Sequence, residues 1–331
     1  MRVRRVRDAG VGALFVAVLA AGVAGAQPAV GSLGATGSTS SVPVNPGPPA
    51  VTHAEAAEYA ENNPGAVPPQ TNDFSCVLTP ENPRPVVLAH GTDSNSYSDF
   101  AALTPLLAAS GRCVFAVNYG LASGAESFGT GQIRVSAAQF GEFVERVRAE
   151  TGATEVDVVG YSQGATVTRY YINKLGGAHV VDRWVGVASP SYGGTFYGLA
   201  TAVAALPGAT DFLEGEFSVA LAEQLQGSAL LTELNVPTDT VPGVQYTTIG
   251  TRFDEVIQPA DSVALRGEGA VNLVVQDLCP QNLTGHFNMI YDEFTLQLIR
   301  HALDPDRVAL GTCTRVALGT GIPEVVRQAN F

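Results

Sequence analysis

Basic residues are scarce in this sequence, which has 18 Lys and Arg against 31 Asp and Glu and a formal net charge of −13. Removal of residues 1–26 would take away four Arg and one Asp, which changes the net charge to −16. A protein this acidic is not drawn to nucleic acid or to anionic membranes by its charge. We therefore expect no nucleic-acid partner, and any contact with lipid has to be apolar.

Cysteines are also few, and no CxxC pair is present, which argues against a metal site. An even number of cysteines favours two disulfides in a protein that is exported to an oxidising compartment. Three pairings are open, and proximity along the chain favours Cys76 with Cys113 and Cys279 with Cys313. Free buried thiols are the alternative.

The most apolar stretch of the sequence, residues 11–26, is too short and too rich in small residues for a convincing membrane span. It follows an Arg-rich start and ends in Ala-Gly-Ala. This is the pattern of a secretory signal peptide over residues 1–26, so we expect a secreted protein. A retained anchor and a twin-arginine signal at Arg4-Arg5 are the less favoured alternatives.

Residues 27–50 are rich in Gly, Ser and Pro and are expected to form a flexible leader, because they carry too little apolar surface to offset their ordering entropy. Residues 51–331 show no internal repeat and fit one large domain. Apolar strand patterns alternate there with helical patterns, which indicates an α/β fold with a mostly parallel sheet and helices on both faces. The expected strands are 85–90, 113–119, 155–162, 181–190 and 244–251, and the expected helices are 99–111, 136–152, 165–177 and 287–303.

Residues 196–235 form a long helix-prone segment between two expected strands, where a simple fold needs one helix. The segment is a candidate lid or cap over a site. Ordinary packing helices explain the same pattern equally well.

The sequence Gly160-Tyr161-Ser162-Gln163-Gly164 is a G-x-S-x-G motif that directly follows an expected strand and directly precedes an expected helix. In this context the turn is tight, and the two glycines avoid Cβ clashes with the neighbouring strand and helix. The turn raises the hydroxyl of Ser162 above the sheet. Ser162 is therefore the candidate nucleophile.

A serine nucleophile needs a histidine base and a carboxylate that orients it, and in this context the chain order is Ser, acid, His. His286 fits best, because it lies in a loop just before the late helix. Asp254 follows an expected strand and is the preferred acid, with Glu255 as the neighbouring alternative.

The developing oxyanion requires two backbone N–H donors. One is expected from Gln163, the residue after the nucleophile. The other is expected from the loop His90-Gly91-Thr92 after an earlier strand, where Thr92 offers its N–H and its hydroxyl is a third candidate donor.

These residues and the blocks around them resemble the exported bacterial class 2 lipases of the α/β-hydrolase superfamily and are similar to yeast lipase B. The resemblance runs from about residue 76 to residue 304 and includes PVVLAHGT, GYSQG, VGVASPSYGGT, GSALLTELN and TRFDEVIQP. It implies an α/β-hydrolase fold with Ser162, Asp254 and His286 as the triad and Thr92 and Gln163 at the oxyanion hole. It also implies a Cys76–Cys113 disulfide.

Three positions depart from the yeast lipase pattern, and the first is Gly160, where that relative has Thr. Tyr161 and Ser191 stand where that relative has Trp and Asp, so we expect these two side chains to shape the substrate pocket differently.

The resemblance implies a secreted serine lipase or carboxylesterase that hydrolyses acylglycerols or simple esters. The expected protein is a monomer that needs no cofactor or metal, and a lipid–water interface is a candidate site of action. The alternatives are a short-chain esterase or polyester hydrolase, an acyltransferase with the same triad, and a surface-binding homologue that has lost its chemistry.

Overall fold

The computed structural model describes residues 38–195 and 218–323. The expected signal peptide and residues 27–37 of the expected leader lie outside the described residues. So do residues 196–217 of the candidate lid; its remainder contains two short helices, α9 and α10. In the described part of the chain, no helix combines the length and the hydropathy that a membrane crossing requires.

The core of the molecule is a seven-stranded sheet in the order β1-β5-β4-β6-β7-β8-β9. Strands β4 to β9 all pair in parallel, and β1 adds an antiparallel edge to β5. The strands of this sheet are β1 (Thr39–Ser41), β4 (Val86–Ala89), β5 (Val114–Leu121), β6 (Val156–Tyr161), β7 (Val181–Val187), β8 (Gln245–Gly250) and β9 (Val271–Val274).

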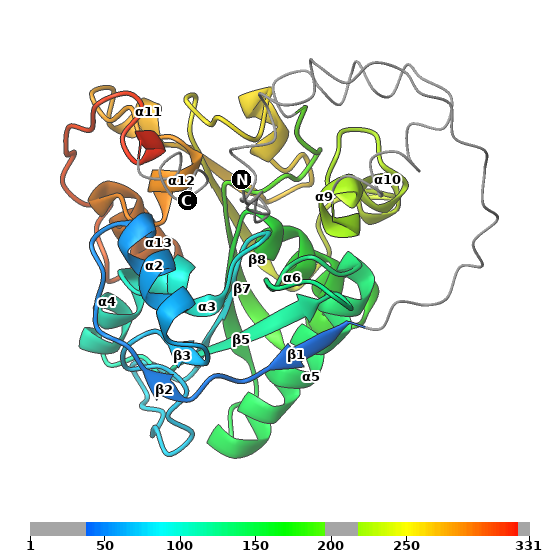
Figure 1. Ribbon diagram of the computed structural model, residues 1–331, viewed down its shortest axis with the longest axis vertical. Helices are drawn as coiled ribbons and strands as arrows, with labels where there is room; N and C mark the ends of the chain where they lie inside the picture. Colours follow the sequence, from blue (N-terminus) through cyan, green and yellow to red (C-terminus); the bar gives the residue numbers. More distant parts are fainter. Residues whose placement is uncertain (1–37, 196–217, 324–331) are drawn as a thin grey trace, which may run out of the picture.

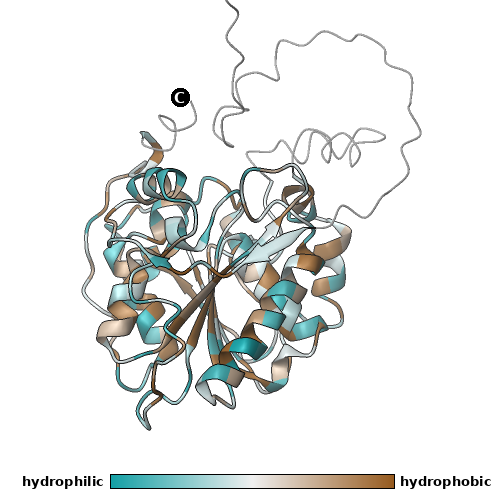
Figure 2. Ribbon diagram, turned by 60° about the horizontal axis from the view of Figure 1, so that its bottom comes forward, coloured by the Kyte–Doolittle hydropathy of each residue, from teal (hydrophilic) through white to brown (hydrophobic). Residues whose placement is uncertain are grey.

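The central strands are buried along their whole length, and are apolar apart from Asp157, because both faces of the sheet are covered. Every residue of β4 and β6 is buried, including Asp157. Val87 of β4 lies opposite Phe115 of β5 on one side and Val158 of β6 on the other. Such continuous apolar runs are typical of parallel strands, and Figure 2 shows them as hydrophobic ribbons at the centre of the molecule.

Helices pack against the two faces of the sheet and form two separate apolar cores. One face carries α2, α3, α4 and α13, and the other carries α5 and α6 (Figure 1). The helices are α2 (His53–Asn62), α3 (Ser96–Phe100), α4 (Leu103–Ala109), α5 (Ile133–Thr151), α6 (Gln163–Lys174), α9 (Val219–Glu223), α10 (Ala229–Leu234), α11 (Val275–Leu278), α12 (His286–Met289) and α13 (Glu293–Leu303).

Two of the expected helices are each divided in the structure. The helix expected over residues 99–111 becomes α3 and α4, and the helix expected over 287–303 becomes α12 and α13. In the second case Asp292 begins a new helix, because its carboxylate accepts the N–H of Thr295 as an N-cap.

The expectation of a flexible leader is wrong for residues 38–50, which belong to the folded body. Residues Thr39–Ser41 form the edge strand β1, and β2 (Asn45–Pro46) pairs in parallel with β3 (Ala66–Val67). An edge strand is held by backbone hydrogen bonds to its neighbour, so polar residues can form it. Composition alone does not reveal this.

The structure contains two disulfides, Cys76–Cys113 and Cys279–Cys313, and these are the pairs that proximity along the chain predicted. The first joins the segment before β4 to the start of β5. The second joins the segment after α11 to the tail that follows α13.

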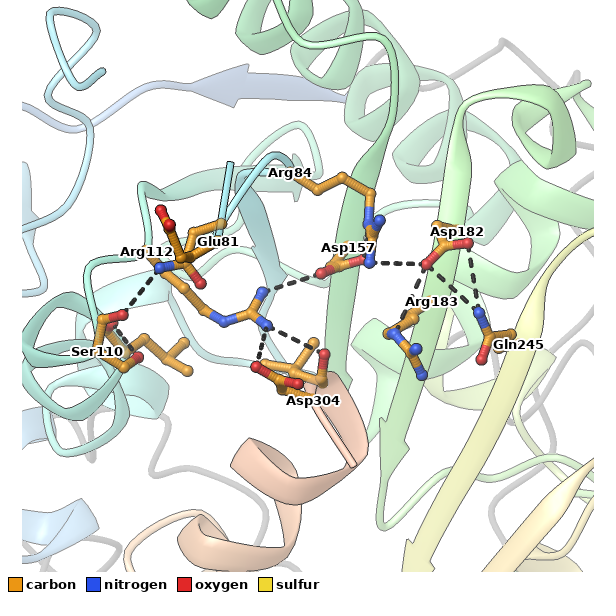
Figure 3. Close-up of polar contacts among 12 residues, drawn as sticks. Glu81, Arg84, Ser110, Arg112, Asp157, Asp182, Arg183, Gln245 and Asp304 are labelled. Carbon is orange, nitrogen blue, oxygen red and sulfur yellow. Dashed lines mark hydrogen bonds and ion pairs between the residues drawn. The ribbon is translucent and has the colours of Figure 1, made fainter. Parts of the chain in front are cut away.

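Charged groups gather at the end of the sheet where the parallel strands begin (Figure 3). The carboxylate of Asp157, fully buried in β6, pairs with Arg84 at 2.8 Å and with Arg112 at 3.0 Å. Arg84 also reaches Asp182 in β7 at 2.9 Å. This network links the starts of four strands, β4, β5, β6 and β7, at the end of the sheet opposite the carboxyl ends of the strands.

Candidate active site

Ser162 lies at the turn between β6 and α6 in a strained backbone conformation, with φ 52° and ψ −120°. A non-glycine residue with positive φ is uncommon and is held in place only by its surroundings. The N–H of Ser162 donates to the carbonyl of Val187 in β7 at 2.8 Å. Its side chain therefore stands at the carboxyl ends of the parallel strands.

The glycines that flank this turn are required by space. A Cβ on Gly160 would lie 2.5 Å from the backbone of Gly164 and Ala165, and a Cβ on Gly164 would overlap the carbonyl of Ala89 in β4. The spacing of the motif therefore follows from the closeness of α6 to β4 and β6.

The structure brings the three expected triad side chains together, although they are far apart in the sequence. Nε2 of His286 lies 3.1 Å from Oγ of Ser162, and Nδ1 of His286 lies 3.0 Å from Oδ2 of Asp254. All three residues are buried. This arrangement can pass a proton from the serine hydroxyl to the imidazole.

Asp254, and not Glu255, contacts the imidazole. The second carboxylate oxygen of Asp254 accepts the N–H groups of Val256 at 2.8 Å and Ile257 at 2.6 Å, which fixes the direction of the carboxylate. Glu255 instead accepts the backbone N–H of His286. The two neighbouring acids thus hold the histidine at its ring and at its main chain.

The charge of His286 is set by opposing effects. Burial alone lowers the pKa of His286, but the adjacent Asp254, together with Glu255 and Asp99, raises it above its usual value. Because an ionised carboxylate only accepts hydrogen bonds, Nδ1 of His286 carries a proton. In the neutral ring, Nε2 is then free to accept from the hydroxyl of Ser162.

The loop after β4 is held by His90. Nε2 of His90 accepts the N–H of Tyr119 at 3.2 Å, so Nδ1 carries the proton and donates to the carbonyl of Gly91 at 2.9 Å. Burial lowers the pKa of His90, which keeps the ring neutral. Because a trans peptide is planar, this bond directs the N–H of Thr92 the opposite way.

The N–H groups of Thr92 and Gln163 have no hydrogen-bond partner within the described residues. Gln163 begins α6, where the first N–H groups of a helix are unpaired. The loop lies against the nucleophile, since a Cβ placed on Gly91 would be 3.5 Å from Cβ of Ser162. Two backbone donors are therefore available beside the serine.

The hydroxyl of Thr92 receives two hydrogen bonds. The side-chain amides of Gln163 and Gln224 both donate to its oxygen, at 2.9 and 3.1 Å. With the oxygen accepting twice, its own proton is free to donate elsewhere. Gln224 follows α9. The sequence does not predict this contact, because no motif marks a glutamine for it.

Tyr161 and Ser191, the two residues expected to shape the substrate pocket, are both buried. The hydroxyl of Tyr161 donates to the carbonyl of His286 at 2.9 Å, and that of Ser191 donates to the carbonyl of Val263 at 2.8 Å. Both hydroxyls therefore support the main chain around the site.

The carboxylates and the histidine of the site raise the question of a metal ion. Among residues 38–195 and 218–323, no group of three or more His, Cys, Asp and Glu is placed to hold one.

Comparison of the chain with known proteins identifies its family. A model of the class 2 lipases matches residues 83–297, well over half of the chain. The chain belongs to the class 2 lipase family. The matched region contains the G-x-S-x-G turn, the loop after β4 and the segment that carries Asp254 and His286.

Solved structures of lipases share the fold of this member of the class 2 lipase family. Aspergillus fumigatus lipase B is similar with a TM-score of 0.56 and 18% sequence identity, over 75% of this chain and 62% of the Aspergillus chain. A lipase of Bacillus licheniformis in its mature form gives 0.51 and 15%, over 68% of this chain and 94% of that chain. This chain thus spans less than two-thirds of the Aspergillus protein. With its mostly parallel sheet and covering helices, the protein has an α/β-hydrolase fold.

Proposed function

We propose that this protein is a secreted serine lipase or carboxylesterase that hydrolyses acylglycerols or other carboxylic esters through an acyl-enzyme on Ser162. The observation that carries the proposal is the continuous path from Ser162 Oγ to His286 Nε2, and from His286 Nδ1 to Asp254. Membership of the class 2 lipases supports ester hydrolysis. The two disulfides fit an oxidising compartment.

In the first half of the reaction, His286 takes the proton of Ser162 as its oxygen attacks the ester carbonyl carbon. Asp254 holds the imidazole in the required tautomer and stabilises the imidazolium. The N–H groups of Thr92 and Gln163 and the hydroxyl of Thr92 donate to the oxyanion. The tetrahedral intermediate collapses as His286 protonates the leaving alcohol, and Ser162 keeps the acyl group.

In the second half, His286 takes a proton from water as the water oxygen attacks the acyl-enzyme carbonyl. The same donors hold the second oxyanion. His286 then returns its proton to Oγ of Ser162, and the carboxylic acid leaves. Loss of one oxyanion donor typically lowers turnover about 100-fold or more.

Covalent labelling tests the nucleophile directly. A fluorophosphonate probe should label Ser162 of the wild-type protein, and Ser162→Ala should remove both the label and the esterase activity. A matched control is Ser189→Ala, a buried serine after β7 whose hydroxyl contacts Ser191 and not the imidazole. Unlabelled native protein that hydrolyses no ester would overturn the proposal.

Chain-length dependence separates a lipase from a short-chain esterase. Hydrolysis of emulsified long-chain acylglycerols at a rate comparable to butyrate esters indicates a lipase. Activity confined to soluble short-chain esters indicates an esterase, and the role of Ser162 stands in either case.

A further inference from the structure

Asp99 is a buried carboxylate beside the active site that no step of the proposed reaction uses. It lies in α3 with an exposed fraction of 0%. Its oxygens accept hydrogen bonds from the N–H of Gly91 at 2.7 Å, the hydroxyl of Ser94 at 2.6 Å and Nε2 of His53 at 3.1 Å. A carboxylate removed from water is costly unless it is paired and hydrogen-bonded. Loss of one of these contacts therefore leaves the buried carboxylate less well paired.

Asp99 stays ionised in this environment. Burial by itself raises its pKa, but the hydrogen bond and charge of His53, with the bonds from Gly91 and Ser94, bring the pKa below its usual value. An ionised carboxylate only accepts, so Nε2 of His53 donates the hydrogen bond. Within the described residues, His53 is the basic side chain that pairs with Asp99.

His53 comes from the N-terminal helix α2, 46 residues away in the sequence. Helix α2 packs against α3, as Figure 1 shows. The rings of His53 and Tyr291 are in T-shaped contact, with centroids 6.0 Å apart. The second ring nitrogen of His53, Nδ1, is buried without a hydrogen-bond partner among the described residues. The polar function of this histidine is therefore its bond to Asp99.

The Asp99 carboxylate contacts the loop after β4, residues 90–92, which is called the oxyanion loop below. It holds the N–H of Gly91, and the next N–H along the chain is the proposed oxyanion donor of Thr92. A Cβ placed on Gly91 would lie 3.4 Å from Oδ2 of Asp99 and 3.5 Å from Cβ of Ser162. A shift of this carboxylate is thus transmitted to the donor through one residue.

We propose that His53 is a positioning residue, which holds the Asp99 carboxylate against Gly91 and thereby fixes the oxyanion loop. The N-terminal segment before the family's matched region then serves catalysis as well as packing. The inference rests on the proposed ester hydrolysis at Ser162, and it adds a part of the chain that this reaction does not otherwise involve.

The test compares His53→Ala with Thr52→Ala, substitutions of two neighbouring residues at the N-terminal end of α2. Thr52 is the N-cap of α2 and accepts the N–H of Glu55, so its loss destabilises the helix without touching Asp99. We expect His53→Ala to lower kcat about 10-fold, less than the loss of an oxyanion donor, with KM almost unchanged. Thr52→Ala should retain the wild-type kcat. His53→Gln, whose amide can donate to Asp99, should restore most of the activity.

A trifluoromethyl ketone inhibitor reads the oxyanion hole separately from substrate binding, because its hemiketal oxygen occupies that hole. Its Ki should rise in His53→Ala by the same factor as kcat falls. A kcat and Ki in His53→Ala that change no more than in Thr52→Ala would overturn the proposal.

Failure of the proposed function is recognisable, because the wild-type protein would then hydrolyse no ester and leave Ser162 unlabelled. The positioning role is still tested in that case by hydrogen exchange of the Gly91 amide. His53→Ala should accelerate this exchange more than Thr52→Ala does. Equal exchange in the two variants would contradict the role of His53.

Discussion

At the scale of single residues, the two neighbouring acids Asp254 and Glu255 show how position decides chemistry. Asp254 touches the ring of His286 and sets its tautomer, whereas Glu255 accepts the main-chain N–H of the same residue. We therefore expect Asp254→Asn to lower kcat about 10⁴-fold through the wrong tautomer, and Glu255→Gln to cost far less. Initial rates on a butyrate ester measure both, and equal losses would contradict this division of roles.

Glu255 should also influence the pH dependence of the reaction. His286 must be neutral to accept the serine proton, so activity falls as the pH drops through its pKa. Because the nearby carboxylates raise this pKa, the acid limb of kcat/KM should lie above pH 6.5, the ordinary value for histidine.

Removal of the Glu255 charge in Glu255→Gln should move that limb to lower pH, since one of the charges that favour the imidazolium is lost. A pH profile of kcat/KM measures the shift. Glu142→Gln, on the exposed side of α5, is the control for the same chemical change at a distance and should leave the limb in place. A limb that does not move in Glu255→Gln would exclude a role of this charge at the imidazole.

The sequence could predict which residues meet at the site only where a motif or chain order marks them. Ser162 is marked by the glycines around it, and His286 and Asp254 by the order of acid and base. Asp99, His53 and Gln224 carry no such mark, because their contacts depend on how α2, α3 and α9 fold back on the loop after β4. Their positions are a result of tertiary packing.

At the scale of elements, the turn from β6 to α6 depends on the absence of a side chain at Gly164. A Cβ there overlaps the carbonyl of Ala89 in β4, and a clash with backbone cannot be relieved by a change of rotamer. Gly164→Ala should lower the free energy of unfolding by about 3 kcal/mol and reduce kcat by moving Ser162. Urea unfolding and the specific activity of the folded protein measure the two effects.

Gly176→Ala is the matched control. Gly176 lies just after the C-terminal end of α6, and a Cβ added there would have no atoms within 4 Å. Its positive φ makes the substitution cost about 1 kcal/mol, and kcat should stay at the wild-type value. Similar activities of the two variants would show that the space around Gly164 is not what places Ser162.

The elements themselves were predictable where their burial is regular. The apolar runs predicted five strands of the sheet, since a strand covered on both faces contains few polar residues. The edge strands β1 and β9 lack this signal: every residue of β1 is exposed, and β9 is half-buried at most. Helix breaks such as Asp292 were also missed, because a cap is recognised only when its hydrogen bond is seen.

At the scale of the whole molecule, the two ends of the parallel strands have different functions. The proposed chemistry lies at the carboxyl ends of the strands, and the ion-pair network of Asp157 lies at their beginnings. Asp157→Asn should therefore lower the free energy of unfolding by about 3–5 kcal/mol, because Arg84 and Arg112 lose a buried partner, with kcat unchanged. Asp182→Asn, at a more exposed pair, should cost at most about 1 kcal/mol. Denaturant unfolding measures the stability of both variants, and initial rates measure their kcat. A loss of kcat in Asp157→Asn would show that the ion-pair network at the starts of the strands influences the site at their carboxyl ends.

The two disulfides close loops of similar length, with sequence separations of 37 and 34 residues. Loop-closure entropy then predicts that replacement of either pair by Ala lowers the free energy of unfolding by about 4 kcal/mol. Their effects on turnover should differ, because only Cys279–Cys313 braces the segment that leads to His286. That segment is held by Gln276, which donates to the carbonyl of Asn282, and by Thr251, which donates to that of Thr284.

We therefore expect the Cys279→Ala/Cys313→Ala protein to lose kcat as well as stability, whereas Cys76→Ala/Cys113→Ala should lose stability alone. Both variants are to be compared well below their unfolding temperatures, where each is fully folded, so that a lower kcat reports the site and not the folded fraction. Because the base lies 3.1 Å from the nucleophile, a displacement of its loop weakens the one contact on which proton transfer depends. Equal kcat values in the two variants would mean that the hydrogen bonds of Gln276 and Thr251 hold His286 in place without the disulfide.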